Sequence, residues 1–138
     1  MRVLLIHCKK YNVKIIRIAT RPHNIKPEKI LERIQDCNNC ICALITIEKN
    51  DDGEKTTKEL SQEIIKMSKE VGIKNIVLLP FAHLSNNLAD SKECIEIIDL
   101  LQERLRQDVI VLRSHFGSDK ELLLNICGHP GNVRYREF

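Results

Sequence analysis

Two short stretches of the sequence carry residue types that can take part in catalysis. The first, Pro80 to Ala89, follows a strongly apolar segment and contains His83. The second, His115 to Lys120, places a histidine and a lysine ahead of another apolar segment. Open α/β sheets hold ligands just beyond the carboxyl ends of their strands, where loops offer main-chain groups. These stretches are the candidate functional sites, although an isolated histidine is more often structural and an isolated lysine more often solvated.

Several common catalytic motifs are absent. Five glycines spread over 138 residues form neither a phosphate-binding P-loop nor a dinucleotide-binding fingerprint. There is no Gly-x-Ser-x-Gly motif and no helical pair of histidines of the kind that binds zinc in metalloproteases. Aromatic residues make up only 4% of the chain, which argues against a base-stacking surface such as that of an RNA-recognition motif.

The six cysteines are many for a chain without a signal peptide. Cys37 and Cys40 have the spacing of a metal-ligand pair. Neither Cys94 nor Cys127 adds a second pair at suitable spacing, so a zinc site is disfavoured and no metal ligands are assigned. The alternation of Cys40 and Cys42 instead indicates small apolar residues on a buried strand.

The length and composition are those of one globular domain, residues 1–138. Apolar residues make up 43% of the chain and charged residues 30%, which excludes a disordered protein. No apolar run is long enough to cross a membrane, and the first residues lack the apolar core of a signal peptide. We therefore expect a cytoplasmic protein with no membrane association.

The net charge of +3 is unevenly distributed. Residues 1–36 hold nine Lys or Arg against three Asp or Glu, whereas residues 37–107 hold nine against twelve. Such an asymmetry allows a phosphate-facing surface near the N-terminus, although a solvated basic hairpin accounts for it equally well.

The pattern of apolar residues predicts a mixed sheet with helices. We expect strands over residues 2–8 and 11–19, paired as an antiparallel hairpin around Lys9 and Lys10, and then a short helix from Pro27 to Gln35. Further strands are expected over 40–48, 75–80, 108–113 and 120–127, with helices over 56–71 and 90–107. The alternation from residue 40 onward indicates an α/β fold with a mixed (α+β) sheet against which the helices pack.

Separated blocks of the sequence together resemble the N-terminal editing domain of archaeal threonyl-tRNA synthetase. The blocks are Met1 to His7, Ile45 to Lys49, Pro80 to Ala89, Phe116-Gly117 with Lys120, and Cys127 to Pro130. Their order, and a similarity that runs nearly end to end, make the resemblance specific. The Pro-Phe-Ala-His tetrapeptide alone would not make the resemblance specific.

The resemblance implies a fold like that of D-aminoacyl-tRNA deacylases, a homodimer, and hydrolysis of the ester that joins a mischarged L-serine to the 3′ end of tRNA(Thr). Residues 1–138 would then be the N-terminal editing module of a longer synthetase. Editing by such a module needs no cofactor. ATP and zinc enter only if the full synthetase carries its aminoacylation domain.

The resemblance also implies the residues of the site. A lysine and a histidine line the family's site and match Lys120 and His83, which become the expected catalytic residues; His83 is expected to bind the ribose or the water and is not assigned as a general base. The family holds its substrate largely through main-chain atoms, which here would lie near Ile47, Pro80, Phe81, Ala82 and Phe116.

Three positions depart from the family pattern. The aromatic residue that usually precedes the lysine is Asp119, the acidic residue after the Gly-His-Pro block is Val133, and an aspartate near the first histidine is Lys9. Asp119 is expected either to pair with Lys120 or, if the strand alternates, to point away from it. Two alternatives therefore stay open: a tRNA-binding appendage without hydrolysis, and a D-aminoacyl-tRNA deacylase.

Overall fold

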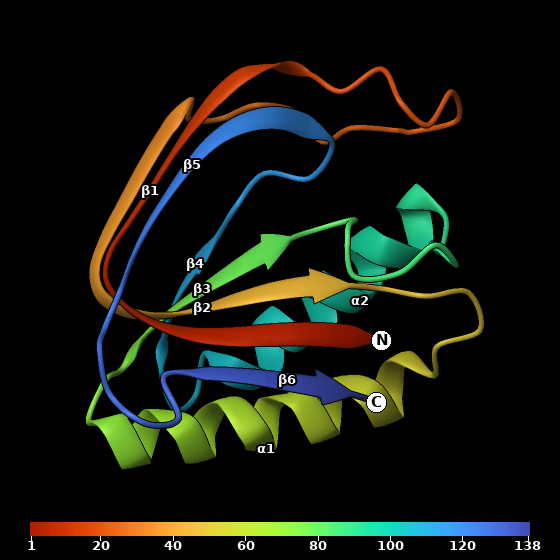
Figure 1. Cartoon of the computed structure of the whole chain (residues 1–138). Helices are drawn as coiled ribbons and strands as arrows, with labels where there is room; N and C mark the ends of the chain where they lie inside the picture. The colour runs from red at the N-terminus through yellow and green to blue at the C-terminus, as the bar shows by residue number, and fades with distance from the viewer.

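The computed structural model describes all 138 residues, and it shows a six-stranded mixed sheet with two helices packed against it (Figure 1). The strands are β1 (Arg2–Ile18), β2 (Ile34–Thr46), β3 (Asn75–Pro80), β4 (Ile110–Arg113), β5 (Ser118–Ile126) and β6 (Val133–Glu137). The helices are α1 (Gly53–Val71) and α2 (Ser91–Leu105). The predicted α/β class with helices on a mixed sheet is confirmed.

The sheet runs in the order β4-β3-β2-β1-β5, and β6 pairs with the first half of β1. β1 is antiparallel to β2, β5 and β6, whereas β2, β3 and β4 are parallel to one another. In the parallel pair, Ile45 lies opposite Pro80. The carboxyl ends of β2 and β3 therefore meet at one edge of the sheet, where α/β folds place their ligands.

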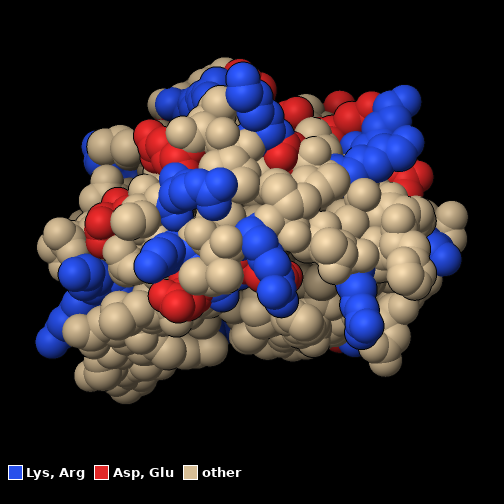
Figure 2. Space-filling model, turned by 90° about the horizontal axis from the view of Figure 1, so that it is seen from above, with Lys and Arg blue, Asp and Glu red and all other residues tan.

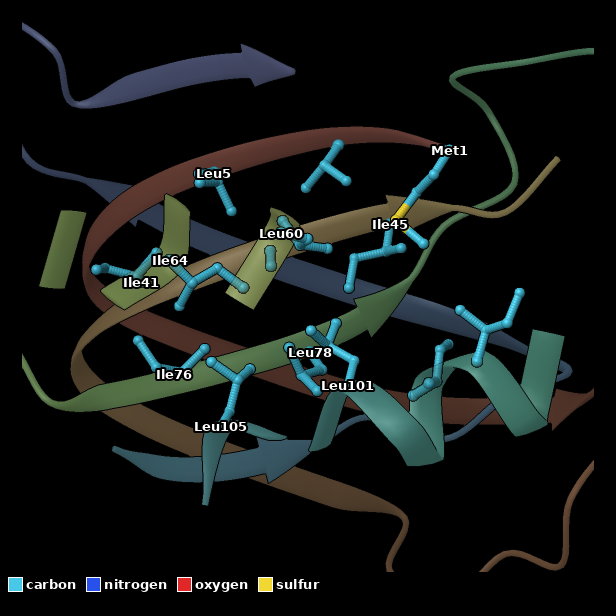
Figure 3. Packing of buried hydrophobic residues seen from close by; sticks show 14 of the residues in the cluster. Met1, Leu5, Ile41, Ile45, Leu60, Ile64, Ile76, Leu78, Leu101 and Leu105 are labelled. Atoms are coloured by element: carbon cyan, nitrogen blue, oxygen red, sulfur yellow. The ribbon is translucent and has the colours of Figure 1, made fainter. Parts of the chain in front are cut away.

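The central strands are buried on both faces. On one face, alternate strand residues pack against Leu60 of α1 and Leu101 of α2, among them Leu5, Ile41 and Leu78 (Figure 3). On the other face, the curved outer halves of β1, β2 and β5 bend over a smaller cluster that contains Cys40 and Cys42 (Figure 1). Both thiols are fully buried, as their alternation predicted.

The predicted hairpin around Lys9 and Lys10 is wrong, because β1 continues through these residues as one strand of 17 residues. Both lysines are exposed at an irregularity of the pairing between β1 and β5, where the register shifts. Tyr11 and Val13 beyond it remain buried. The two lysines mark a bulge that bends the strand, and a β-bulge exposes residues without ending the pairing.

Two further expectations for secondary structure fail. The helix expected from Pro27 to Gln35 does not form: residues 27–33 have no regular structure, and β2 has begun by Ile34. Long-range bonds hold this segment, since the main-chain N–H of Ile15 donates to the carbonyl of Arg33 at 2.7 Å. β6 was not anticipated, because its charged, alternating residues pair only with the first half of β1.

The two long helices begin and end close to where the sequence predicts. The carboxylate of Asp90 caps α2 by accepting the N–H of Glu93 at 2.9 Å, as expected. α1 begins three residues before its predicted start, with Asp52 as its N-cap, and ends at Gly72, whose φ of 69° suits glycine. Neither helix is long and apolar enough to cross a membrane.

Candidate functional site

A cavity of about 590 Å³ lies beside the carboxyl ends of β2 and β3. Its walls come from the ends of these strands, the loop after β3, the segment between β1 and β2, the start of α2 and the start of β5. All seven residues expected at the site line it: Ile47, Pro80, Phe81, Ala82, His83, Phe116 and Lys120. Blocks that lie far apart in the sequence thus border one space, large enough for an aminoacyl nucleoside.

The loop that follows β3, residues 81–89, is pinned to the end of β2. The Thr46 hydroxyl donates to the carbonyl of Phe81 and accepts the N–H of Leu84 at 3.4 Å. Further along, the N–H of Ala89 donates to the carbonyl of Ile47 at 3.1 Å. Buried backbone and hydroxyl groups are thereby satisfied, and the loop is held on both sides of His83.

Within this loop the main chain itself offers hydrogen-bond donors. The N–H groups of Ala82 and His83 have no acceptor elsewhere in the chain, and neither does that of Ile47. All three residues line the cavity. Phe116 differs, because its N–H already donates to the Glu28 carboxylate at 2.9 Å. The expected main-chain contacts can therefore come from residues 47, 82 and 83, whereas the carbonyl of Phe116 also has a partner already, the N–H of Glu28 at 3.2 Å.

Lys120 lies on β5 opposite Ile15, and its side chain is half-buried in the cavity wall. Its ammonium donates to the carbonyl of Ser118 at 3.4 Å. Burial lowers the pKa of Lys120 to about 8, and the nearby carboxylates of Asp119 and Glu28 oppose this shift. Near neutral pH the group is therefore a cation beside a largely apolar cavity, where its charge acts more strongly than in water.

Asp119 forms no ion pair with Lys120, although it also lines the cavity and its charge acts on the ammonium. Its carboxylate accepts from the guanidinium of Arg17 on β1 at 2.7 Å, and both side chains are exposed. Alternation along β5 places consecutive side chains on opposite faces of the sheet. Of the two arrangements expected for Asp119, the ion pair with Lys120 does not form, and Asp119 is paired with Arg17 instead.

His83 is exposed at the mouth of the cavity. Its ring packs edge-on against that of Phe81, with centroids 5.0 Å apart, and makes no hydrogen bond within the chain. It also borders a second, more open and polar depression formed with Arg2, Glu48 and residues 84–87. The imidazole is thus placed to contact a ligand that enters from outside, rather than to support the fold.

Two other departures from the family pattern lie outside the cavity. Val133 is exposed on β6 opposite Ile6, and Lys9 is exposed at the bulge of β1. Neither lines the cavity. Within this chain, the changes at these positions leave the lining of the cavity unaltered.

Sequence reasoning missed four residues of the site: Arg21, Glu28, Thr46 and Cys94. Arg21, Thr46 and Cys94 line the cavity, and Glu28 holds its wall from behind. Burial raises the pKa of the Cys94 thiol to about 11, so that it stays protonated and is a poor nucleophile near neutral pH. The only local signal for any of them was a threonine within the apolar run of residues 40–47.

Comparison with known proteins gives one family. A model described as the archaea-specific editing domain of threonyl-tRNA synthetase matches residues 1–137. A threonine–tRNA ligase of Staphylothermus marinus is 34% identical over 134 residues, which cover 94% of this chain and 21% of that protein.

A second relative is named for editing alone. The threonine–tRNA ligase editing subunit of Saccharolobus solfataricus is 30% identical over 130 residues, covering 94% of this chain and 32% of that protein. A threonine–tRNA ligase of Caldivirga maquilingensis is 29% identical over 135 residues, covering 94% and 21%. The chain thus spans about a fifth to a third of the length of these relatives.

Proposed function

The chain belongs to the archaea-specific editing domains of threonyl-tRNA synthetase, and from that premise we propose that it hydrolyses the ester between L-serine and the 3′ end of tRNA(Thr). One observation carries the proposal: Lys120, His83 and three unpaired main-chain N–H groups border the same cavity. The arrangement supplies a cation, polar donors and a partly enclosed space, which ester hydrolysis requires.

An aminoacyl ester is already activated, so a modest site suffices. The Lys120 ammonium stabilises the negative charge that develops on the ester carbonyl oxygen, or orients the attacking water, and it needs to accept no proton for either role. His83 donates to or accepts from the ribose or the water. Water adds to the acyl carbon, the bond between this carbon and the ribose oxygen then breaks, and the proton lost by the water passes to the ribose oxygen, which leaves as a hydroxyl. The vicinal hydroxyl of the terminal adenosine assists.

Selection of serine over threonine follows from size. Main-chain N–H groups at residues 47, 82 and 83 contact polar groups that both amino acids share, so threonine has to be rejected by exclusion of its extra methyl group. In the pocket where a synthetase selects its amino acid, one methyl group gives only ~1–3 kcal/mol of discrimination. A second, smaller site that hydrolyses the serine product therefore adds selectivity.

Release of serine from mischarged tRNA(Thr) tests the function directly. We expect the chain to free serine from L-seryl-tRNA(Thr) well above the spontaneous rate and to leave L-threonyl-tRNA(Thr) intact. Bound but unhydrolysed tRNA would favour the tRNA-binding appendage. Hydrolysis of a D-tyrosyl ester together with sparing of the L-seryl ester would favour the D-aminoacyl-tRNA deacylase.

The pH dependence of editing should follow the charge on Lys120. Because the ammonium is the active form and its pKa is about 8, the catalysed rate is highest below pH 8 and falls as pH rises through that value. One unit above the pKa, about one-tenth of the cation remains. Rates measured from pH 6 to 9.5, after subtraction of hydroxide-driven hydrolysis, check this; a rate that climbs through pH 9 would make the amine a base instead.

A basic segment, residues 9–33, is proposed to bind the phosphates of the tRNA. Its eight Lys and Arg side chains are all exposed, and Arg21 also lines the cavity. Of its two acidic residues, Glu28 is paired with Arg113, so that Glu32 alone is an exposed acid. Figure 2 shows Lys and Arg side chains spread over the face of the molecule that this segment forms with neighbouring elements.

Charge reversal tests the basic segment. Lys26→Glu with Lys29→Glu should raise KM for seryl-tRNA about tenfold and weaken the salt dependence of binding by ~1–2 units of slope. Seryl-adenosine, which lacks the stem, should be hydrolysed as before. The matched control is Lys66→Glu with Lys69→Glu on α1, also exposed. Equal effects of the two pairs would place the tRNA elsewhere.

The chain is also proposed to form a homodimer and to act as the N-terminal module of a longer synthetase. Five large apolar side chains stay exposed on the paired strands β1 and β5: Ile16, Ile18, Leu122, Leu123 and Ile126. Leu122 lines the cavity and Leu123 faces the other side of the sheet, so only those side chains that share a face would be buried against a partner. Light scattering of the isolated chain measures the mass.

Editing itself is proposed to need no cofactor, with ATP and zinc serving only an aminoacylation domain.

A further inference from the structure

The segment between β1 and β2 is held against the turn that precedes β5 by one acidic residue. One oxygen of the Glu28 carboxylate accepts the main-chain N–H of Phe116 at 2.9 Å, and the other pairs with the guanidinium of Arg113. The main-chain N–H of Glu28 donates to the carbonyl of Phe116 at 3.2 Å. Glu28 thus binds both main-chain polar groups of Phe116, which lines the cavity.

The same contact continues toward the cation of the site. The carbonyl of Glu28 accepts a hydrogen bond at 2.8 Å from the Nε2 of His115, because a carbonyl can only accept. In the neutral ring, Nδ1 then accepts from the Ser118 hydroxyl at 2.8 Å. The carbonyl of Ser118 in turn accepts from the Lys120 ammonium at 3.4 Å. These bonds connect the main chain of Glu28 to the Lys120 ammonium by way of His115 and Ser118.

Glu28 is itself held by rigid elements. Arg113, at the end of β4, pairs with Glu28 and with Asp99 of α2. The carbonyl of Arg113 accepts from the side chain of Gln35 on β2 at 3.1 Å. The side chains of Glu28 and Arg113 are only 24% and 18% exposed, so the pair is more strongly coupled than an ion pair in open solvent.

We propose that Glu28 is a positioning residue of the editing reaction: through its contacts with Phe116 and Arg113, it fixes the turn that presents Lys120 to the cavity. The proposal rests on the function proposed above. Its observations are independent of that function, since they concern only contacts within this chain.

The charged groups around Lys120 come from several elements. Asp119 lies on the same strand but is paired with Arg17 of β1. Arg21 and His83 line the cavity from the segment before β2 and the loop after β3, and the Cys94 thiol of α2 stays protonated. The carboxylates of Asp119 and, to a smaller extent, Glu28 raise the pKa of the ammonium against the effect of burial. Of the two, Glu28 is the one bonded to the turn that precedes β5.

Two substitutions separate the position of the turn from the charge of the carboxylate. Glu28→Gln keeps an oxygen for the Phe116 N–H but removes the charge, so the alkaline fall of the rate should move to lower pH. Glu28→Asp keeps the charge, but its side chain is one methylene shorter and holds the turn less well. We therefore expect kcat to fall about tenfold while the pH dependence of the rate stays unchanged. Both are assayed with seryl-adenosine, and Glu32→Gln, an exposed carboxylate of the same segment, is the control.

An NMR titration of Lys120 distinguishes failure of this inference from failure of the proposed function, because it needs no substrate. The pKa of the Lys120 ammonium should be lower in Glu28→Gln than in the parent chain, whatever the parent hydrolyses. An unchanged Lys120 titration, together with parental kcat in Glu28→Asp, would overturn the inference. If either variant melts far below the parent, Arg113→Lys, which loosens the anchor of Glu28 but keeps its charge, should lower kcat without moving the Lys120 titration; parental kcat in Arg113→Lys would overturn the inference.

Discussion

Lys120→Met is expected to slow the release of serine from mischarged tRNA(Thr) by about 10²- to 10³-fold, the usual effect of removing one preorganised group that stabilises the oxyanion. Methionine fills nearly the same space but carries no charge and donates no hydrogen bond. The lysine lies half-buried in the wall of the cavity, and β5 contains no other cationic side chain. Single-turnover rates at pH 7 measure the effect.

Stability should not fall in the same variant. Burial lowers the pKa of Lys120 in the folded chain, which means that the charged form is disfavoured by folding at neutral pH. That cost is fully present below pH 8 and is relieved as pH rises through the folded pKa. Lys120→Met should therefore melt at or above the parent temperature at pH 7, and Lys66→Met on the exposed face of α1 provides the control. Parental turnover in Lys120→Met would remove the lysine from the mechanism.

Gly117→Ala is expected to reduce editing about 100-fold, because small displacements of catalytic groups have effects of that size. Gly117 has a φ of +83°, which L-residues rarely adopt, at a cost of ~1–2 kcal/mol. A Cβ there would lie 2.7 Å from the Cα of Pro27, a backbone atom that cannot move without its neighbours. The turn would shift, and Phe116 and Lys120 would shift with it.

The comparison for this variant is Gly128→Ala. Gly128 has no positive φ, and a Cβ there meets no atom within 4 Å. It should behave as the parent in both melting temperature and rate, whereas Gly117→Ala should lose both. Equal rates in the two variants would show that the contact between Pro27 and Gly117 does not position the site.

The parts of the fold that local pattern determines could be predicted from the sequence. The face of α1, the Asp90 cap of α2 and the buried alternation at Cys40 and Cys42 depend on residues a few positions apart. The segment from Pro27 to Arg33 has a helix-start signal as well, but its main chain bonds to Phe116 and Ile15, far away in sequence. Tertiary contacts outweighed local propensity there.

The candidate site divides in the same way. His83 and Lys120 lie in short sequence blocks that are distinctive in type, so the residues around them are enough to single them out. Thr46 and Glu28 could not be found in this way, since each acts on a peptide group 35 or 88 residues away. When a hydroxyl or carboxylate bonds to a peptide group far away in sequence, the residues next to it in sequence do not indicate that contact.

The unpaired N–H groups of residues 47, 82 and 83 have a consequence for how this site tolerates change. A peptide hydrogen belongs to every amino acid except proline, so replacing Ala82 or Ile47 by another residue leaves the donor in place. Alanine scanning does not detect such donors, because alanine keeps the peptide N–H. Substitution by proline, or replacement of the peptide bond by an ester, removes the donor and would measure its contribution. The side chains at these positions can thus differ widely between related proteins while the main-chain donors that bind the amino acid are retained.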